Sequence, residues 1–144
     1  MNNTKQSYIG IDYGTKRVGI AVSDDAGRMA FPLEVVEEGV AIERVVALVK
    51  EREAQAVIVG ESKDLSGRDN PVMERVRRFA DSVAREAQVP VHFEPELFTS
   101  AMAARPDRGE HPRNARKGGG LPRVALDASA AALILQSWLG RVNK

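Results

Sequence analysis

The fold of this chain is decided near its start, by the stretch Ser7-Tyr8-Ile9-Gly10-Ile11-Asp12-Tyr13-Gly14-Thr15-Lys16-Arg17-Val18-Gly19-Ile20-Ala21-Val22-Ser23. A glycine turn, Gly14 to Lys16, divides it into two segments in which apolar residues alternate with other residues. Alternation with a period of two is typical of β-strands, and two strands joined by so short a turn form a hairpin. The sequence therefore predicts a hairpin whose first strand places Ile9 and Ile11 on one face and Asp12 on the other.

The remaining chain changes between strand and helix patterns. A further strand completes an antiparallel meander, and a run of apolar residues at 56–60 is typical of a strand buried on both faces. Asn70 and Pro71 suit the N-cap and first position of a helix. The predicted elements are strands at 7–14, 17–23, 30–36, 56–60 and 89–93, and helices at 40–53, about 70–87 and about 126–139. Strand–helix–strand units pair in parallel through right-handed crossovers, so we expect one α/β domain with a mixed five-stranded sheet flanked by helices.

The composition limits the chemistry. The 144 residues include no cysteine and only two histidines, which excludes disulfides and cysteine nucleophiles and leaves little material for a serine–histidine triad or a histidine-rich zinc site. The net charge of +1 favours a local rather than a global polyanion-binding surface. No signal-peptide core is recognised, and the longest apolar run, Val124 to Leu135, is shorter than the roughly 20 residues that span a bilayer. We expect a cytoplasmic protein with no membrane partner.

Carboxylates occupy three positions that suit a ligand site. Asp12 is near the end of a strand, Asp127 begins an apolar helix, and Glu94 and Glu96 follow the last predicted strand, at the end where ligand sites gather in parallel sheets. Each has a simpler explanation: a turn aspartate, a helix N-cap and a pair of solvated loop glutamates. Together they suit Mg²⁺, which takes oxygen ligands, and a pair of such ions can activate water and stabilise the leaving oxygen in phosphodiester cleavage.

A basic segment supplies a second candidate feature. Residues 105–123 have no apolar periodicity and contain Gly118-Gly119-Gly120, which predicts a flexible loop. Its cationic side chains would neutralise phosphates in a largely sequence-independent way, although a solvated loop would have the same composition. Lys16 is either a further phosphate contact or a turn lysine, and Arg75, Arg77 and Arg78 are expected on the exposed face of their helix. The cationic residues of the loop are Arg105, Arg108, Arg113, Arg116, Lys117 and Arg123.

Two segments carry a resemblance to a known family. The opening, from Ile9 to Asp24, and the ending, from Leu126 to Leu139, resemble the YqgF family of pre-16S ribosomal RNA nucleases, also described as Holliday-junction-resolvase-like. The resemblance implies a ribonuclease H-like fold and three acidic ligands for Mg²⁺ or Mn²⁺, at Asp12, Glu96 and Asp127. The family's Asp-Glu-Arg-Leu-Thr-Thr stretch aligns with 95–100, where proline and leucine replace the aspartate and the arginine. Glu94 could take the place of the lost carboxylate.

The resemblance also implies a function. It predicts a nuclease that matures the 5′ end of pre-16S ribosomal RNA, acting as a monomer or homodimer. The alternatives are a Holliday junction resolvase-like endonuclease that cuts branched DNA, and a non-catalytic nucleic-acid-binding module of the same fold. An actin-like or sugar-kinase ATPase is disfavoured because the chain has the length of one domain, whereas those enzymes close two around the nucleotide. The residues expected to contact the nucleic acid are Lys16, Arg113, Arg116, Lys117 and Arg123.

Overall fold

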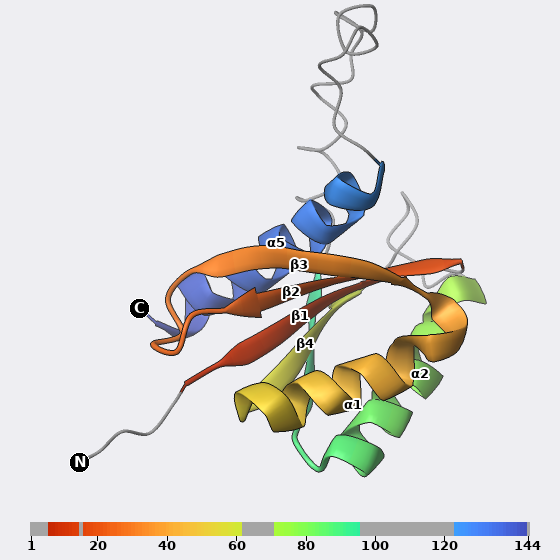
Figure 1. Ribbon diagram of the computed structural model, residues 1–144, viewed down its shortest axis with the longest axis horizontal. Coiled ribbons are helices and arrows are strands. Elements are labelled where there is room, and N and C mark those ends of the chain that lie inside the picture. The colour runs from red at the N-terminus through yellow and green to blue at the C-terminus, as the bar shows by residue number, and fades with distance from the viewer. Residues whose placement is uncertain (1–5, 15, 62–70, 96–122, 144) are drawn as a thin grey trace, which may run out of the picture.

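A computed structural model describes residues 6–14, 16–61, 71–95 and 123–143, with residues 71 and 123–127 described by their backbone alone. A sheet lies between two helices on one face and a third helix on the other (Figure 1). None of the helices in this part of the chain is long and apolar enough to cross a membrane. The elements are β1 (Tyr8–Tyr13), β2 (Arg17–Ser23), β3 (Ala30–Glu37), the short 3₁₀ helix η1 (Glu38–Val40), α1 (Ala41–Arg52), β4 (Ala56–Glu61), α2 (Pro71–Ala87), β5 (Val91–Pro95) and α5 (Arg123–Val142).

The five strands run in the order β3-β2-β1-β4-β5. The first three form the antiparallel meander, while β4 pairs in parallel with β1 and β5 pairs in parallel with β4. The predicted mixed five-stranded sheet is therefore confirmed. Its hairpin register places Asp12 opposite Gly19, and the parallel register places Ile11 opposite Val59.

Each face of the sheet has its own core. Ile9, Ile11 and Ile20 are fully buried on the face that α1 and α2 cover. The other face packs against α5, where Ile58 of β4 meets Leu135. Burying each such side chain contributes about 1.5–3 kcal/mol relative to leaving it in water, so both helix layers are held mainly by apolar packing.

The bounds of β5 and α5 differ from the predicted ones. The last strand begins at Val91 rather than Val89, because a left-handed residue, Gln88 (φ 59°), follows α2 and the chain turns through Pro90 before it joins the sheet. Pro90 still pairs with the sheet by its carbonyl oxygen, which accepts a bond of 3.0 Å from the amide of Val57. The strand then continues to Pro95, so Glu94 is a strand residue and not the loop residue we expected. Arg123, the last residue of the predicted loop, is helical.

Candidate metal and nucleic-acid site

Asp12 is the predicted ligand that the structure describes in full. It is half-buried, next to last in β1, and its side chain points to the α5 face because its neighbours Ile11 and Tyr13 belong to the core on the opposite face. Its cross-strand partner Gly19 has no side chain. The flanking position on β2 therefore places no side chain beside the Asp12 carboxylate.

The direction of α5 brings its first turns to the same end of β1. Tyr8 contacts Trp138, with ring centroids 5.0 Å apart, and a Cβ atom at Gly10 would be 2.9 Å from the carbonyl oxygen of Ala131. The helix thus runs antiparallel to the strand. Two residues of strand advance about 6.6 Å and four residues of helix about 6 Å, so Asp12 is level with the turn that precedes Ala131. That turn contains Asp127, of which the structure describes the backbone.

Glu94 is already engaged by α5. It is only 3% exposed, and its carboxylate accepts a hydrogen bond of 2.7 Å from the Ser137 hydroxyl and forms an ion pair with Arg141. The parallel register pairs Glu94 with Gly60, which places it on the far side of β4 from β1. The expectation of an exposed, solvated glutamate is therefore wrong, because the carboxylate ties β5 to α5.

The other predicted residues differ in how far they are described. Glu96, Arg113, Arg116 and Lys117 lie outside the described residues, and Arg123 is described as the first residue of α5 by its backbone. Lys16 is exposed in the hairpin turn, where its carbonyl oxygen accepts a bond of 3.0 Å from the Glu38 amide.

The chemistry of the described donor fits Mg²⁺. Mg²⁺ prefers oxygen ligands, keeps several waters and is bound in proteins through one or two carboxylates. A half-buried aspartate whose cross-strand neighbour is a glycine offers such an oxygen. Among the side chains that the structure describes, no three acidic, histidine or cysteine groups converge on one point, so Asp12 would need partners from the segments around Glu96 and Asp127.

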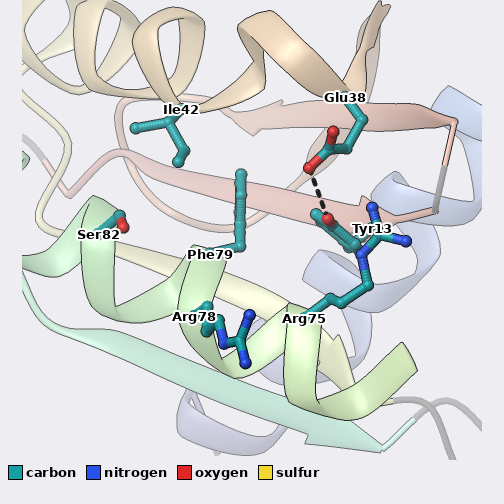
Figure 2. A pocket seen from close by; sticks show the side chains of 7 residues that line it. All are labelled: Tyr13, Glu38, Ile42, Arg75, Arg78, Phe79 and Ser82. Carbon is teal, nitrogen blue, oxygen red and sulfur yellow. Dashed lines mark hydrogen bonds between the residues drawn. The ribbon is translucent and has the colours of Figure 1, made fainter. Parts of the chain in front are cut away.

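A second feature was not found from the sequence. A cavity of about 190 Å³ opens between η1, α2 and the end of β1, on the sheet face opposite the Asp12 side chain (Figure 2). We call it the arginine pocket; its lining residues are Tyr13, Glu38, Ile42, Arg75, Arg78, Phe79 and Ser82. Spacing on α2 predicts only that its arginines are exposed, and the elements that complete the pocket are far from them in sequence.

Tyr13 connects the two sides of the arginine pocket. Its ring packs on Phe79, with centroids 5.1 Å apart, and its hydroxyl donates a hydrogen bond of 2.8 Å to the Glu38 carboxylate. Burial, together with the bond to Glu38 and the charge of Glu38, raises the pKa of Tyr13, whereas the neighbouring Arg75 guanidinium lowers it. The phenol is therefore a proton donor to Glu38 at neutral pH, with Arg75 beside it.

Comparison with known families gives a match over nearly the whole chain. The family model described as RuvX, Holliday junction resolvase, matches residues 6–141. A protein from Nocardioides sp., named "Putative pre-16S rRNA nuclease", is 40% identical over 137 residues, which cover 89% of this chain and 83% of that protein. A protein of the same name from Thermobifida fusca is 38% identical over 136 residues, covering 91% of this chain and 85% of that protein.

A solved structure gives the same result for the fold. The RuvC protein of Thermus thermophilus, in complex with a Holliday junction substrate, superimposes with a TM-score of 0.60. It is 26% identical, and the match covers 95% of this chain and 96% of that chain. The expected ribonuclease H-like fold is therefore confirmed by comparison as well as by topology.

Proposed function

This chain belongs to the RuvX family, and we therefore propose that it is a metal-dependent nuclease that hydrolyses phosphodiester bonds in the 5′-end maturation of pre-16S ribosomal RNA. Two relatives that share 40% and 38% of their matched residues with it carry the name of this activity. The observation that carries the proposal is the position of Asp12. Its half-buried carboxylate is on the α5 face of the sheet, level with the turn of α5 that contains Asp127.

The proposed ligands are Asp12, Glu96 and Asp127, which would hold Mg²⁺ or Mn²⁺. When bound, such an ion activates a water molecule and stabilises the oxygen that leaves phosphorus. The protein's own contribution is to hold the carboxylates in place before substrate arrives. Asp12 is fixed by a central strand of the sheet, with β2 on one side and β4 on the other. Asp127 is held by a helix whose inner face is fully buried against the sheet at Ile134, Leu135 and Leu139.

The proposed substrate contacts are cationic. Lys16 is exposed in the turn that follows β1, four residues from Asp12, and this position suits a contact with a phosphate near the cleaved bond. Arg113, Arg116 and Lys117 belong to the basic segment that precedes α5 in the sequence, and Arg123 is the first residue of α5, four residues before Asp127. Cations at both places would neutralise the backbone without reading the base sequence.

Branched DNA is the second candidate substrate. A specific observation favours it: the solved structure that superimposes over 95% of this chain is a RuvC bound to a Holliday junction. Both candidates require hydrolysis of a phosphodiester bond, so they share the proposed catalytic residues and differ in what the surrounding surface accepts.

The test compares wild type with Asp12→Asn on two substrates, precursor 16S ribosomal RNA fragments with their 5′ extension and a four-way DNA junction. Asp25→Asn is the matched control, because Asp25 is an exposed aspartate in the β2–β3 turn and loses the same charge. We expect Mg²⁺-dependent cleavage by wild type and by Asp25→Asn. Asp12→Asn should cut at least about 100-fold more slowly, because metal-held charge contributes several kcal/mol in the transition state.

Each other result has a definite meaning. Cleavage that survives both a chelator and Asp12→Asn shows that the protein is not a metal-dependent nuclease of this kind. Cleavage of the junction alone moves the assignment to the DNA candidate. A wild-type protein that binds either nucleic acid without cutting it in Mg²⁺ or Mn²⁺ is the non-catalytic module of the same fold.

A further inference from the structure

We propose that the arginine pocket binds a backbone phosphate of the nucleic-acid strand, beside the phosphate that is cleaved at Asp12. This inference rests on the proposed function, because it names a second contact of the same substrate. Figure 2 shows the pocket between η1 and α2, with the Arg75 side chain reaching from α2 toward Tyr13 and the Arg78 side chain lying close to α2.

The charge of the pocket favours an anion. Arg75 and Arg78 are three residues apart on α2 and line the same cavity. Each guanidinium presents planar N–H donors that match a phosphate, and a pair of them can bind one phosphate from two directions. Arg78 also forms an ion pair of 3.5 Å with Glu74, but both side chains are more than two-thirds exposed, so this pair contributes little and would exchange readily for a phosphate.

Among the described residues that line the pocket, Glu38 is the acidic one, and it contacts Tyr13, which lies beside Arg75 (Figure 2). The Tyr13 hydroxyl donates its proton to Glu38 at 2.8 Å, which leaves the phenol oxygen as an acceptor beside Arg75. The exposed Arg75 guanidinium lies beside that oxygen (Figure 2). The negative charge of Glu38 also weakens the attraction for a phosphate, so the pocket suits a contact that releases the strand again after cleavage.

The location joins this pocket to the proposed catalytic site. Tyr13 follows Asp12 directly, their Cα atoms are about 3.8 Å apart, and their side chains point to opposite faces of the sheet. A nucleic-acid strand that passes over the end of β1 therefore meets Asp12 on one face of the sheet and the arginine pocket on the other face. Lys16 is exposed in the same turn and is bonded through its backbone to Glu38, which places a further cation along this path.

The first test measures binding without cleavage. Anisotropy of a labelled single-stranded RNA is recorded in EDTA over a range of salt concentrations, with the full chain and its variants. We expect Arg75→Gln with Arg78→Gln to weaken binding about tenfold and to reduce the salt slope by about 0.7 for each phosphate that the protein no longer neutralises. The control is Lys50→Gln with Arg85→Gln, which removes the same charge from exposed residues of α1 and α2 that do not line the pocket.

The second test changes binding in the opposite direction. Glu38→Gln removes the negative charge but keeps an oxygen that accepts the Tyr13 hydroxyl, so we expect RNA to bind a few-fold more tightly. Glu43→Gln is the control, because Glu43 is an exposed glutamate of α1 outside the pocket. A variant that folds poorly cannot gain affinity, so this result separates a binding role from a structural one.

Three outcomes would overturn the proposal. In the first, the pocket variant and the control variant of the cationic residues lose the same affinity for RNA. In the second, Glu38→Gln and Glu43→Gln bind RNA equally well. In the third, inorganic phosphate binds through the two arginines while RNA binding does not depend on them. The proposed function fails separately: RNA that binds through the pocket but is never cut in Mg²⁺ leaves this site standing. Cleavage that requires Asp12, with RNA binding unaffected by the pocket arginines, supports the proposed function and rejects the pocket as a phosphate site.

Discussion

Gly10 of β1 and Leu135 of α5 are in such close contact that a Cβ atom on Gly10 would be 2.6 Å from the Cβ of Leu135. The same atom would be 2.9 Å from the backbone carbonyl oxygen of Ala131. Neither neighbour is the end of a flexible side chain, so only a shift of the helix or the strand makes room. This contact sets how closely α5 approaches the sheet, and with it the position of Asp12 relative to the first turns of α5.

We expect Gly10→Ala to destabilise the protein by about 1–3 kcal/mol, the typical result of adding a methyl group to a well-packed contact. For a domain of this size that lowers Tm by roughly 2–4 °C per kcal/mol, which thermal unfolding by circular dichroism measures. It should also slow cleavage, because α5 is pushed away from Asp12.

The control variant for Gly10→Ala is expected to gain stability instead of losing it. Gly140 is near the end of α5, and a Cβ atom there would meet nothing within 4 Å. Gly140→Ala should therefore raise stability by up to about 1 kcal/mol through helix propensity alone. A Gly10→Ala variant as stable as wild type would show that the helix is not held at this distance.

Local patterns were sufficient for most of the fold. The alternation around the glycine turn predicts β1, β2 and the face on which Asp12 lies, because a strand has a period of two whatever packs on it. The β-branched run of β4 correctly indicates a strand buried on both faces. The start of β5 was misplaced because a left-handed Gln88 and the turn at Pro90 precede it, and neither follows from apolar periodicity.

The site is harder to derive from sequence because its contacts join distant segments. The glycines around Asp12 indicate that a backbone or a phosphate comes close to this strand. At Gly10 the group that comes close is the backbone of α5, more than 120 residues later in the sequence. The local sequence predicts that Glu94 is solvated, because its partners Ser137 and Arg141 are on that same helix, far from Glu94 in the sequence. The arginine pocket likewise requires β1, η1 and α2 to meet, and the sequence of α2 alone indicates only an exposed stripe.

The Glu94–Arg141 pair should respond unequally to the loss of either partner. Glu94 is 4% exposed by its side chain and Arg141 is 59% exposed. Arg141→Gln leaves a buried carboxylate with Ser137 as its described partner, which should cost about 1–3 kcal/mol. Glu94→Gln leaves an arginine that water can solvate and keeps an oxygen for Ser137, so the loss should be smaller. Urea unfolding of both variants measures the difference, and equal losses would contradict the asymmetry.

Asp24 should make stability depend on pH in the acid range. Its carboxylate accepts amide bonds from Arg28 at 2.8 Å and Met29 at 3.3 Å, and the bond from Arg28 is the main reason why its pKa is lowered. A lowered folded-state pKa gives stability that is present above the unfolded value, about 3.9, and is lost as pH falls through the folded value.

Asp24→Ala should therefore lower stability by about 1 kcal/mol at pH 7, because the amide bonds are removed, and by less as the pH falls below about 4. Chemical unfolding of the variant and wild type across this range measures the difference. Asp25→Ala, an exposed neighbour in the same turn, is the control and should change stability less at every pH. A gap between Asp24→Ala and wild type that stays constant down to about pH 2 would show that the Asp24 charge does not stabilise this turn.

Metal binding should stabilise the folded protein through Asp12. A ligand that binds only the folded state raises stability by about 2.7 kcal/mol at 100 times its Kd, so Mg²⁺ or Mn²⁺ should raise the Tm of wild type by several degrees over EDTA. Asp12→Asn should lose most of this shift, because an amide oxygen is a weaker ligand for a hard cation than a carboxylate. The measurement needs no substrate, so it tests the metal site even if the natural nucleic acid is not the one supplied.

Asp25→Asn keeps this test specific, since it removes an equal charge from the β2–β3 turn and should retain the full metal-dependent shift. If both variants lose the shift equally, the ion acts by general screening of acidic charge and not at a site. If Asp12→Asn retains the wild-type shift, the metal is bound elsewhere, and Asp12 is then the turn aspartate that its position before Gly14 also allows. A shift that depends on Asp12 alone requires a coordinating carboxylate on the α5 face of β1, where a helix packed against Gly10 holds the Asp127 turn at the same level.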